Sequence, residues 1–365
     1  MNNSEFIVVG GGIIGMTTAR ELALCGAKVS IFDKGKLGMQ ASWAAGGIIS
    51  SMRPWAESRA AIQLSEYSKN LYPEFIEKLK IESGIDPEYN KSGLVIVNKD
   101  HAIKTKDWAK SHNIKIEEEF KIKSECLNLP GYSIKLPDIA QVRPPRLLNA
   151  LRKSLENLGV NIYENTEITE LEFCSNKFQS ISYNNKTMSA DSLIITAGAW
   201  CKSLTDKFNI KMDIKPIRGQ MLCIEPEQQI CENIILDGAH YFIPRMDGRL
   251  LIGSTMEDVG YINQTTEEGK ADLLSWAQSM FASLSDAKLV SHWSGLRPST
   301  SRSKPFIGQL PDVKNVYINT GHFRKGILQA PASAKILVDS ILSVESFMDI
   351  SIFGFDDTKS ALKIA

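Results

Sequence analysis

A glycine-rich hexapeptide near the start of the chain has the spacing that binds a pyrophosphate. Residues 10–15 read Gly-Gly-Gly-Ile-Ile-Gly and satisfy the pattern GxGxxG. The apolar run 6–9 predicts a buried strand before the glycines, and apolar residues at helical spacing follow them. A second predicted strand, 28–32, leads to Asp33, whose carboxylate can accept hydrogen bonds from a ribose. This strand–turn–helix–strand unit predicts a dinucleotide site.

Each residue of the pattern has its own physical task. Gly10 permits the tight turn, Gly12 lets the backbone approach a pyrophosphate, and Gly15 lets the helix pack on the strand. The helix that begins at Ile13 and Ile14 presents free N–H groups and the positive end of its dipole to the phosphates. The pattern does not separate FAD from NAD.

The segment 36–49, Lys-Leu-Gly-Met-Gln-Ala-Ser-Trp-Ala-Ala-Gly-Gly-Ile-Ile, favours FAD. Its small residues allow the backbone to run close to a large planar cofactor. Ser42 is placed to donate to a phosphate or ribitol oxygen, and Ala45 and Gly46 to pass against the flavin ring. A surface loop would fit poorly with Trp43 and the apolar residues at the end of the segment.

The order of these motifs resembles the D-amino-acid oxidase family of flavoproteins, and within it the glycine oxidase branch associated with thiazole synthesis for thiamine. The resemblance spans nearly the whole chain. The motifs that carry it are 10–15 with Asp33, Ala-Ser-Trp-Ala-Ala-Gly-Gly at 41–47, Ile-Thr-Ala-Gly-Ala-Trp at 195–200, Gly-Leu-Arg-Pro at 295–298 and Gly-His-Phe-Arg-Lys-Gly-Ile at 321–327.

The resemblance implies three residues around the reacting carbon. Arg297 matches the arginine that pairs with the substrate carboxylate, and Tyr241 matches a tyrosine whose hydroxyl reaches the same group. Arg324 matches a second arginine beside flavin and substrate. A planar guanidinium suits this task because it binds a carboxylate through two charge-assisted hydrogen bonds.

The motif and the resemblance together define the expected FAD site. Ile168 is expected on the adenine side, and the helix opening near Gly326 is expected to direct its positive end at the flavin. No cysteine follows Cys231, so FAD is expected to bind non-covalently. The expected cofactor-binding residues are Gly10, Gly12, Ile13, Ile14, Gly15, Asp33, Lys34, Ser42, Ala45, Gly46, Ile168, Gly198, His322, Arg324, Gly326, Ile327 and Leu328.

The implied reaction is FAD-dependent oxidative deamination of glycine, sarcosine or a small D-amino acid. A clamped carboxylate would hold the α-carbon over flavin N5 for hydride transfer, and O2 would reoxidise the flavin to give H2O2. His322 and His240 are interpreted as structural. Two departures leave the substrate open: Ala239 stands where glycine oxidases can carry a histidine, and the expected lid, 50–59, is bulky.

Two alternatives remain at this stage. A D-amino-acid dehydrogenase would pass electrons to a quinone, and the apolar run 347–355 could then touch a membrane, although a docked tail fits that run better. A non-catalytic flavin-binding maturation partner is the second alternative. Arg297 with Tyr241 argues against it, since such a protein has no need of a carboxylate clamp.

The elements that must position these residues alternate between strands and helices. Amphipathic helices are expected at 57–84, 145–158 and 326–342. The stretch 213–305 is instead typical of antiparallel sheet. We expect an α/β protein in which a Rossmann-like FAD-binding domain is interleaved with an α+β substrate domain on a mostly antiparallel sheet. The expected FAD-binding segments are 1–85, 145–212 and 303–365, and the expected substrate-binding segments are 86–144 and 213–302.

Composition narrows the cellular context. The chain has 365 residues and zero formal net charge, from 42 basic and 42 acidic residues, which argues against a nucleic-acid partner. Both charge signs mix in the Lys/Glu-rich span 99–125, which is expected to be a solvated helical insertion. The six cysteines show no metal-ligand spacing, and no apolar stretch is long enough for membrane insertion. We expect no metal, buried reduced thiols, a cytoplasmic location and, from the resemblance, a homotetramer.

Overall fold

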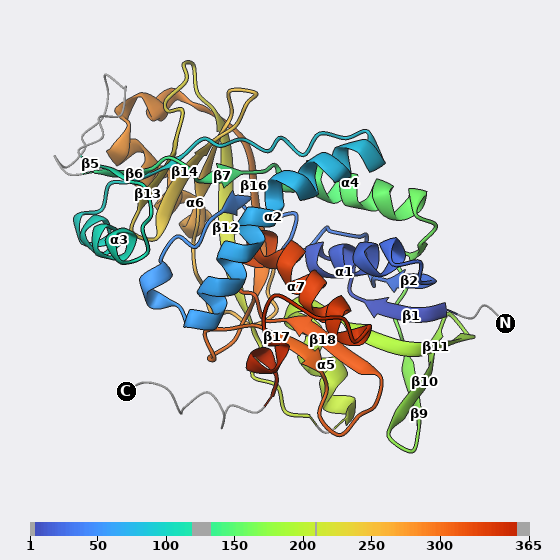
Figure 1. Cartoon of the computed structure of the whole chain (residues 1–365). Helices are drawn as coiled ribbons and strands as arrows, with labels where there is room; N and C mark the ends of the chain where they lie inside the picture. Colours follow the sequence, from blue (N-terminus) through green and yellow to red (C-terminus); the bar gives the residue numbers. More distant parts are fainter. Residues whose placement is uncertain (1–3, 119–132, 209, 356–365) are drawn as a thin grey trace.

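The computed structural model describes residues 4–118, 133–208 and 210–355. Two eight-stranded sheets dominate it. In Figure 1 the first sheet lies beneath a layer of helices, and the second stands at the other end of the molecule. The predicted α/β fold is confirmed, with a Rossmann-like sheet beside a mostly antiparallel one.

The first sheet has a parallel centre. All neighbours from β18 to β8 pair in parallel, and only β17 at the edge is antiparallel to its neighbour. The spatial order is β17 (Phe306–Gln309), β18 (Val316–Thr320), β11 (Lys186–Ile195), β1 (Ser4–Val9), β2 (Val29–Phe32) and β8 (Asn161–Tyr163). Val8 packs against one layer of the protein and Ile7 against the opposite layer. A continuous apolar strand is therefore what this position requires.

Four helices cover one face of this sheet. They are α1 (Ile13–Leu24), α2 (Arg59–Ser83), α4 (Pro144–Asn157) and α7 (Gly326–Ile341). Pro331 lies inside α7 and has no N–H, so the carbonyl of Ile327 loses its usual helical donor. The buried hydroxyl of Tyr72 on α2 donates to that carbonyl instead, at 2.5 Å. This bond ties α2 to the first turn of α7.

An antiparallel extension covers the opposite face. The strands β9 (Glu170–Cys174) and β10 (Lys177–Tyr183) form a hairpin, and β10 pairs with the first half of β11. Phe178 and Ile181 from this hairpin pack with Ile7, so the parallel sheet is buried on both sides. Sequence reasoning did not predict the hairpin.

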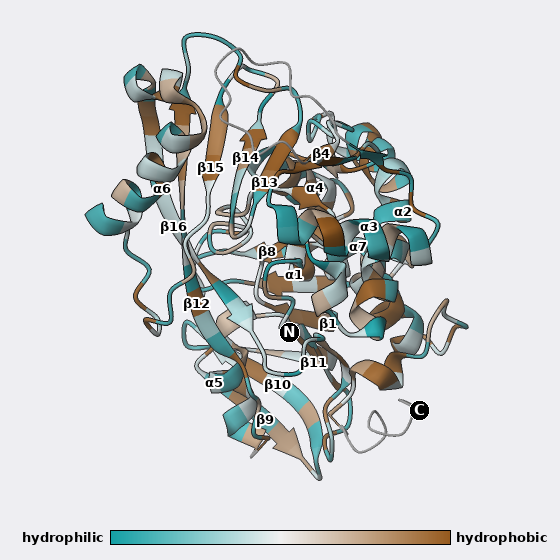
Figure 2. Ribbon diagram, turned by 90° about the vertical axis from the view of Figure 1, so that its left-hand side faces the viewer, coloured by the Kyte–Doolittle hydropathy of each residue, from teal (hydrophilic) through white to brown (hydrophobic). Residues whose placement is uncertain are grey.

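The second sheet is antiparallel except where β13 meets β4. Its strands are β16 (Lys288–Ser299), β12 (Lys215–Glu225), β15 (Leu250–Gly253), β14 (His240–Pro244), β13 (Ile234–Asp237), β4 (Leu94–Ile96), β6 (Ile134–Leu136) and β5 (Glu117–Glu118). The amphipathic helix α6 (Glu267–Met280) covers one face, and Figure 2 shows hydrophobic strands behind its more polar ribbon. The other face packs against Ala102, Ile139 and the segment that contains Ile48 and Met52.

Shorter elements complete the chain. They are the strand pair β3 (Ile48–Ile49) and β7 (Ala140–Gln141), the helices α3 (Lys99–Ser111) and α5 (Cys201–Thr205), and the 3-10 helices η1 (Pro54–Ala56), η2 (Gly198–Trp200), η3 (Asp206–Phe208), η4 (Ala282–Asp286) and η5 (Ile350–Phe353). Only 99–111 of the predicted solvated span is helical, and 119–125 lies outside the described residues. No helix in the described ranges is both long and apolar enough to cross a membrane.

The cysteine prediction needs one correction. Cys201, Cys223 and Cys231 are buried, but Cys25 and Cys174 are exposed. All five are free thiols, and Cys126 lies outside the described residues. Burial raises the pKa of Cys201 and of Cys231 to about 12, so both thiols stay protonated at neutral pH.

Candidate active site

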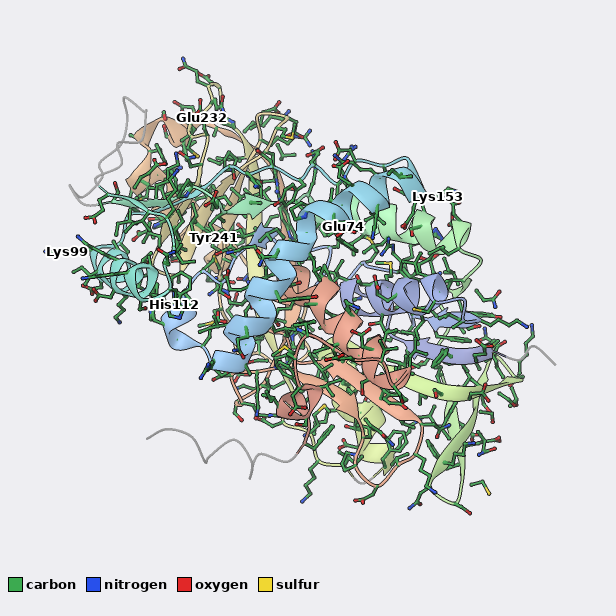
Figure 3. The ribbon with its side chains drawn as sticks, viewed as in Figure 1. Glu74, Lys99, His112, Lys153, Glu232 and Tyr241 are labelled. Atoms are coloured by element: carbon green, nitrogen blue, oxygen red, sulfur yellow. The ribbon has the colours of Figure 1, made fainter. Side chains whose placement is uncertain are left out.

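A cavity of about 340 Å³ lies where the two sheets meet. Its walls come from the turn between β1 and α1, the segment 40–48, the start of α7 and the strands β12, β14 and β16. Figure 3 labels Tyr241 in the interior between the second sheet and the helices, whereas Lys99, Lys153 and Glu232 lie at the periphery. All predicted site residues except Gly15 and Leu328 line this cavity.

One end of the cavity is built from the backbone of the glycine motif. Gly10 has φ +107°, and a Cβ there would lie 2.6 Å from the carbonyl carbon of Thr196. A Cβ on Gly15 would lie 1.9 Å from the carbonyl oxygen of Gly10, so α1 packs directly on the turn. Thr196 donates its hydroxyl to that same carbonyl at 2.7 Å. Gly15 therefore shapes the turn without lining the cavity.

Two side chains hold the turn open towards the cavity. The hydroxyl of Ser42 accepts the N–H of Ile13 at 2.9 Å, at the first turn of α1. The carboxylate of Asp33 accepts the N–H groups of Gly11 at 2.7 Å and Gly35 at 2.8 Å. These contacts place a helix N-terminus and a carboxylate side by side. A helix N-terminus can bind a pyrophosphate, and a carboxylate can bind a ribose.

The segment around Gly46 runs along the cavity at close range to the second sheet. A Cβ on Gly46 would lie 2.6 Å from Ile243 Cδ1 and 3.5 Å from Tyr241 Cε2. The indole of Trp293 donates to the carbonyl of Ala44 at 3.1 Å and fixes this path. A side chain at position 46 would require the end of the Ile243 side chain to move.

The other end of the cavity is built from side chains, with Arg297 at its centre. The guanidinium lies over Gly219 of β12, where an added Cβ would come within 2.0 Å of it. Arg297 donates to the carbonyl oxygens of Thr255 at 3.2 Å and Arg218 at 3.4 Å. Burial lowers the pKa of Arg297, whereas the nearby hydroxyl of Tyr241 opposes that shift.

The charge of Arg297 has no carboxylate partner among the described residues. Glu257, an acid close by, pairs with Arg218, and Glu57 pairs with Lys325 at 2.7 Å. Arg324 also lines the cavity, and its positive charge contributes to lowering the pKa of Arg297. A buried cation without a counter-ion is costly, so this end of the cavity suits an anion.

His322 lines the cavity and is hydrogen-bonded to two polar side chains behind it. Its side chain is 2% exposed, with Nδ1 2.8 Å from Gln329 Oε1 and Nε2 2.8 Å from Asn319 Oδ1. Gln329 donates to Ser65 at 2.9 Å, so its oxygen faces His322 and accepts from Nδ1. Burial lowers the pKa of His322 to about 4. The ring is therefore neutral at physiological pH.

His240 lies outside the cavity lining. It stacks on Trp276 with ring centroids 5.0 Å apart and lies 3.4 Å from Asp272. Its contacts are therefore with Trp276 and Asp272, and its structural role stays a prediction. Within the described ranges, no cluster of three or more histidine, cysteine or acidic side chains is arranged to hold a metal ion.

Comparison with known proteins identifies the family of this chain. The family model for the FAD dependent oxidoreductases matches residues 5–340. The chain belongs to this family. It is 33% identical to a glycine oxidase of Pseudomonas aeruginosa over 95% of this chain and 97% of that protein.

Two further members of the family are close in sequence or structure. The crystal structure of glycine oxidase from Geobacillus kaustophilus superposes with a TM-score of 0.92 at 25% identity, covering 98% of this chain and 99% of that one. A bifunctional protein ThiO/ThiG of Synechocystis is 28% identical over 93% of this chain and 52% of its own length.

The residues fit the cofactor that the family name implies. A Cβ on Gly10 would lie 2.6 Å from the backbone of Thr196, and a Cβ on Gly12 would lie 3.2 Å from Ser42 Oγ. The N-terminus of α7 opens on the cavity at Gly326 without a side-chain cap. Leu328 instead points into the core, because the second residue after Gly326 lies on the buried side of the helix.

Sequence reasoning missed several residues that line or border the cavity. Thr196 had a signal, since it directly follows the buried strand and opens the predicted Ala-Gly-Ala-Trp segment. Asn319 and Met221 had none, because a strand residue reaches a cavity only through the topology of its sheet. Arg53 was noticed only as part of a bulky lid.

Proposed function

We propose that this chain is an FAD-dependent oxidase of glycine and other small amines. The carrying observation is Arg297, a buried guanidinium beside the hydroxyl of Tyr241 with no carboxylate partner in the described chain. It stands in the same cavity as a pyrophosphate cradle. A cofactor cradle and an anion clamp in one cavity support the oxidation of a carboxylated substrate beside a flavin.

The residues divide between cofactor and substrate. The turn at Gly10–Ile14 with Ser42 would hold the pyrophosphate, Asp33 and Lys34 the ribose end, and Ile168 and Gly198 the adenine side. The backbone at Ala45 and Gly46, with His322, Arg324, Gly326 and Ile327, would surround the flavin. Bound FAD supplies the acceptor for a hydride from the substrate α-carbon.

The chain's own task is orientation. Arg297 and Tyr241 would hold the substrate carboxylate at two points. This fixes the orientation of the α-carbon relative to the flavin. No protein base is required if the amine binds uncharged, and the uncharged ring of His322 adds no positive charge to the site. The uncapped N-terminus of α7 directs partial positive charge towards the cavity, where it would stabilise a reduced, anionic ring.

Spectroscopy of the purified holoprotein tests this function. Glycine, sarcosine and D-alanine are added without oxygen, and bleaching of the visible flavin absorbance is followed. We expect bleaching, and one peroxide per flavin when air is admitted. Bleaching without peroxide, relieved by a quinone dye, would indicate the dehydrogenase. If no amine bleaches the flavin, the oxidase and dehydrogenase functions are both wrong, and the non-catalytic maturation partner is the function that is left.

Further parts of the proposal rest on the relatives. The similarity to a protein named ThiO/ThiG supports a role in thiamine synthesis, and the similarity to glycine oxidases supports O2 as the acceptor. The homotetramer and the cytoplasmic location are proposed from the family resemblance alone. Light scattering of the purified protein checks the tetramer, because a monomer would elute with a mass near 40.5 kDa.

A further inference from the structure

A buried arginine lies directly behind the backbone that lines the cavity at Gly46. Arg245 follows β14, and its side chain is buried. Its Nη2 donates to the carbonyl oxygen of Gly46 at 2.8 Å. Its Nη1 donates to the carbonyl oxygen of Val142 at 2.9 Å and to Oε1 of Gln141 at 2.8 Å. Gly46 lines the cavity and Arg245 does not, so Arg245 acts on the cavity through this backbone.

The charge of Arg245 has neutral hydrogen-bond partners. Its three acceptors are two carbonyl oxygens and one amide oxygen. Two acids in its surroundings, Glu88 and Asp247, bind Arg143 instead, at 3.4 Å and 3.0 Å. Burial lowers the pKa of Arg245 to about 10, so the guanidinium still carries its charge at neutral pH. A buried charge of this kind must be compensated by oriented dipoles, and the peptide that follows Gly46 is one of them.

The peptide between Gly46 and Gly47 has two opposite sides. It is a trans peptide, so its C=O and its N–H point in opposite directions. The C=O faces Arg245, and the next carbonyl oxygen, that of Gly47, accepts the N–H of Val142 at 2.9 Å. The N–H of Gly47 has no hydrogen-bond partner in the described chain, and both glycines line the cavity. This N–H is therefore available to a group bound in the cavity.

Two hydrogen bonds through one peptide unit strengthen each other. A cation bound to the carbonyl oxygen polarises the peptide and makes its N–H a stronger donor. A strong donor in a buried site stabilises a partner that gains negative charge. Bound FAD gains electrons when it is reduced, so a donor of this kind favours the reduced state.

We propose that Arg245 is a positioning residue of the FAD site. Through its bond to Gly46 it fixes the peptide between positions 46 and 47 and directs the strengthened N–H of Gly47 at the flavin. The charge of Arg245 thereby raises the midpoint potential of the flavin. This assignment rests on the FAD site described above and is independent of which amine is oxidised.

The midpoint potential of the bound flavin tests this role without any amine. The holoprotein is reduced stepwise with dithionite in the presence of a reference dye. Arg245→Met removes the charge and keeps an unbranched side chain. We expect the two-electron midpoint potential to fall by about 30 mV, which corresponds to about a tenfold change in the reduction equilibrium. Arg249→Gln is the matched control, because it removes one positive charge from the other end of the same loop, where the side chain is partly exposed. Its potential should equal that of the parent.

Gln141→Glu tests the charge while Arg245 itself stays in place. The new carboxylate would pair with Nη1 of Arg245 and compensate its charge, whereas the bond from Nη2 to Gly46 stays. The hydroxyl of Ser92, 3.0 Å from the amide nitrogen of Gln141, can donate to that carboxylate, and the bond from Gln141 to the carbonyl oxygen of Pro244 is lost. We expect the potential to fall in this variant too, and it decides the matter if Arg245→Met does not fold.

The outcomes separate this role from support of the fold and from the proposed oxidase. An unchanged potential in the folded variants, or an equal fall in Arg249→Gln, would overturn the proposal. Lower flavin content with an unchanged potential for the flavin that stays bound would show that Arg245 supports the fold alone, and would also overturn it. A fall in potential in a protein whose flavin no amine bleaches would support the role of Arg245 and contradict the oxidase. Normal glycine oxidation with an unchanged potential would contradict the role of Arg245 alone.

Discussion

The two ends of the cavity are built in opposite ways. The phosphate end is mostly backbone: the glycine turn and the first turn of α1 are consecutive in the chain, and they pack against the backbone of Thr196. The carboxylate end is side chain: Arg297, Tyr241 and Arg324 come from β16, β14 and the loop before α7. The phosphate end requires glycines without side chains, whereas the carboxylate end requires three side chains from different elements to come together.

The difference determines what each end tolerates. At Gly10 and Gly15 a single added methyl group has nowhere to go, because its nearest neighbours are backbone atoms. At the carboxylate end, removal of a side chain leaves space and leaves the substrate carboxylate without its partner, but it does not displace the backbone. The first kind of damage should therefore reach the fold and the cofactor, and the second kind only the substrate.

Gly15→Ala should produce the largest effect. The new Cβ would lie 1.9 Å from the carbonyl oxygen of Gly10, so α1 must move away from the turn. We expect a loss of about 3 kcal/mol or more in unfolding free energy, the upper part of the range for overpacking. The protein should also purify with little flavin. Urea denaturation and the visible spectrum measure both effects.

Gly35→Ala is the matched control in the same region. A Cβ at Gly35 meets only Asp33 Oδ1, at 3.7 Å, which is an ordinary contact. That variant should keep its flavin and its stability. If Gly15→Ala purified yellow and as stable as the parent, the turn would not have the rigidity described above.

Arg297→Ala should have the next largest effect, and only on the substrate side. The variant loses the charge that clamps the carboxylate, but its flavin contacts stay intact. We expect kcat/KM for glycine to fall about a hundredfold to a thousandfold, as when one member of a buried charge pair is removed. Steady-state peroxide release measures the fall, and flavin content is the control. Normal turnover would mean that another group clamps the carboxylate.

These two ends also differ in how far sequence reasoning reached. The turn at 10–15 is local, so its spacing alone predicted the turn and the close packing of the helix at Gly15. The bond that Asp33 accepts from Gly11 was not predicted, because Asp33 was expected to bind a ribose. Arg297 and Tyr241 were found through family resemblance, since nothing in their spacing brings β14 next to β16. Arg53 was not assigned a contact because its partner, Gly238, is 185 positions away. The hairpin β9–β10 escaped for a similar reason: its alternation is short, and its burial depends on the sheet beneath it.

The network at His322 borders the same cavity and should respond to pH. The pKa of His322 in the folded protein, about 4, lies below the ordinary value of 6.5. Between these two pH values the unfolded chain therefore binds a proton at this residue and the folded chain does not. The neutral ring stabilises the fold fully above pH 6.5, and this contribution disappears as pH falls towards 4. Between pH 7 and pH 5 we expect a loss of about 2 kcal/mol from this group.

Denaturation of the parent and of His322→Gln at both pH values checks this prediction. The parent should lose more stability than the variant, because the variant has no proton to bind at this position. Parallel losses in the two proteins would assign the pH dependence to other groups and leave His322 as packing alone.

Tyr241→Phe should give the smallest effect and sharpen the division of labour within the clamp. The substitution removes one neutral hydroxyl and keeps the ring that packs against Gly46 and Gly253. A neutral hydrogen bond contributes about 1 kcal/mol, so kcat/KM should fall about fivefold, far less than for Arg297→Ala. The visible spectrum and the melting temperature should stay the same. A loss as large as that of Arg297→Ala would show that the hydroxyl orients the guanidinium as well as the substrate, and would make the clamp one cooperative unit.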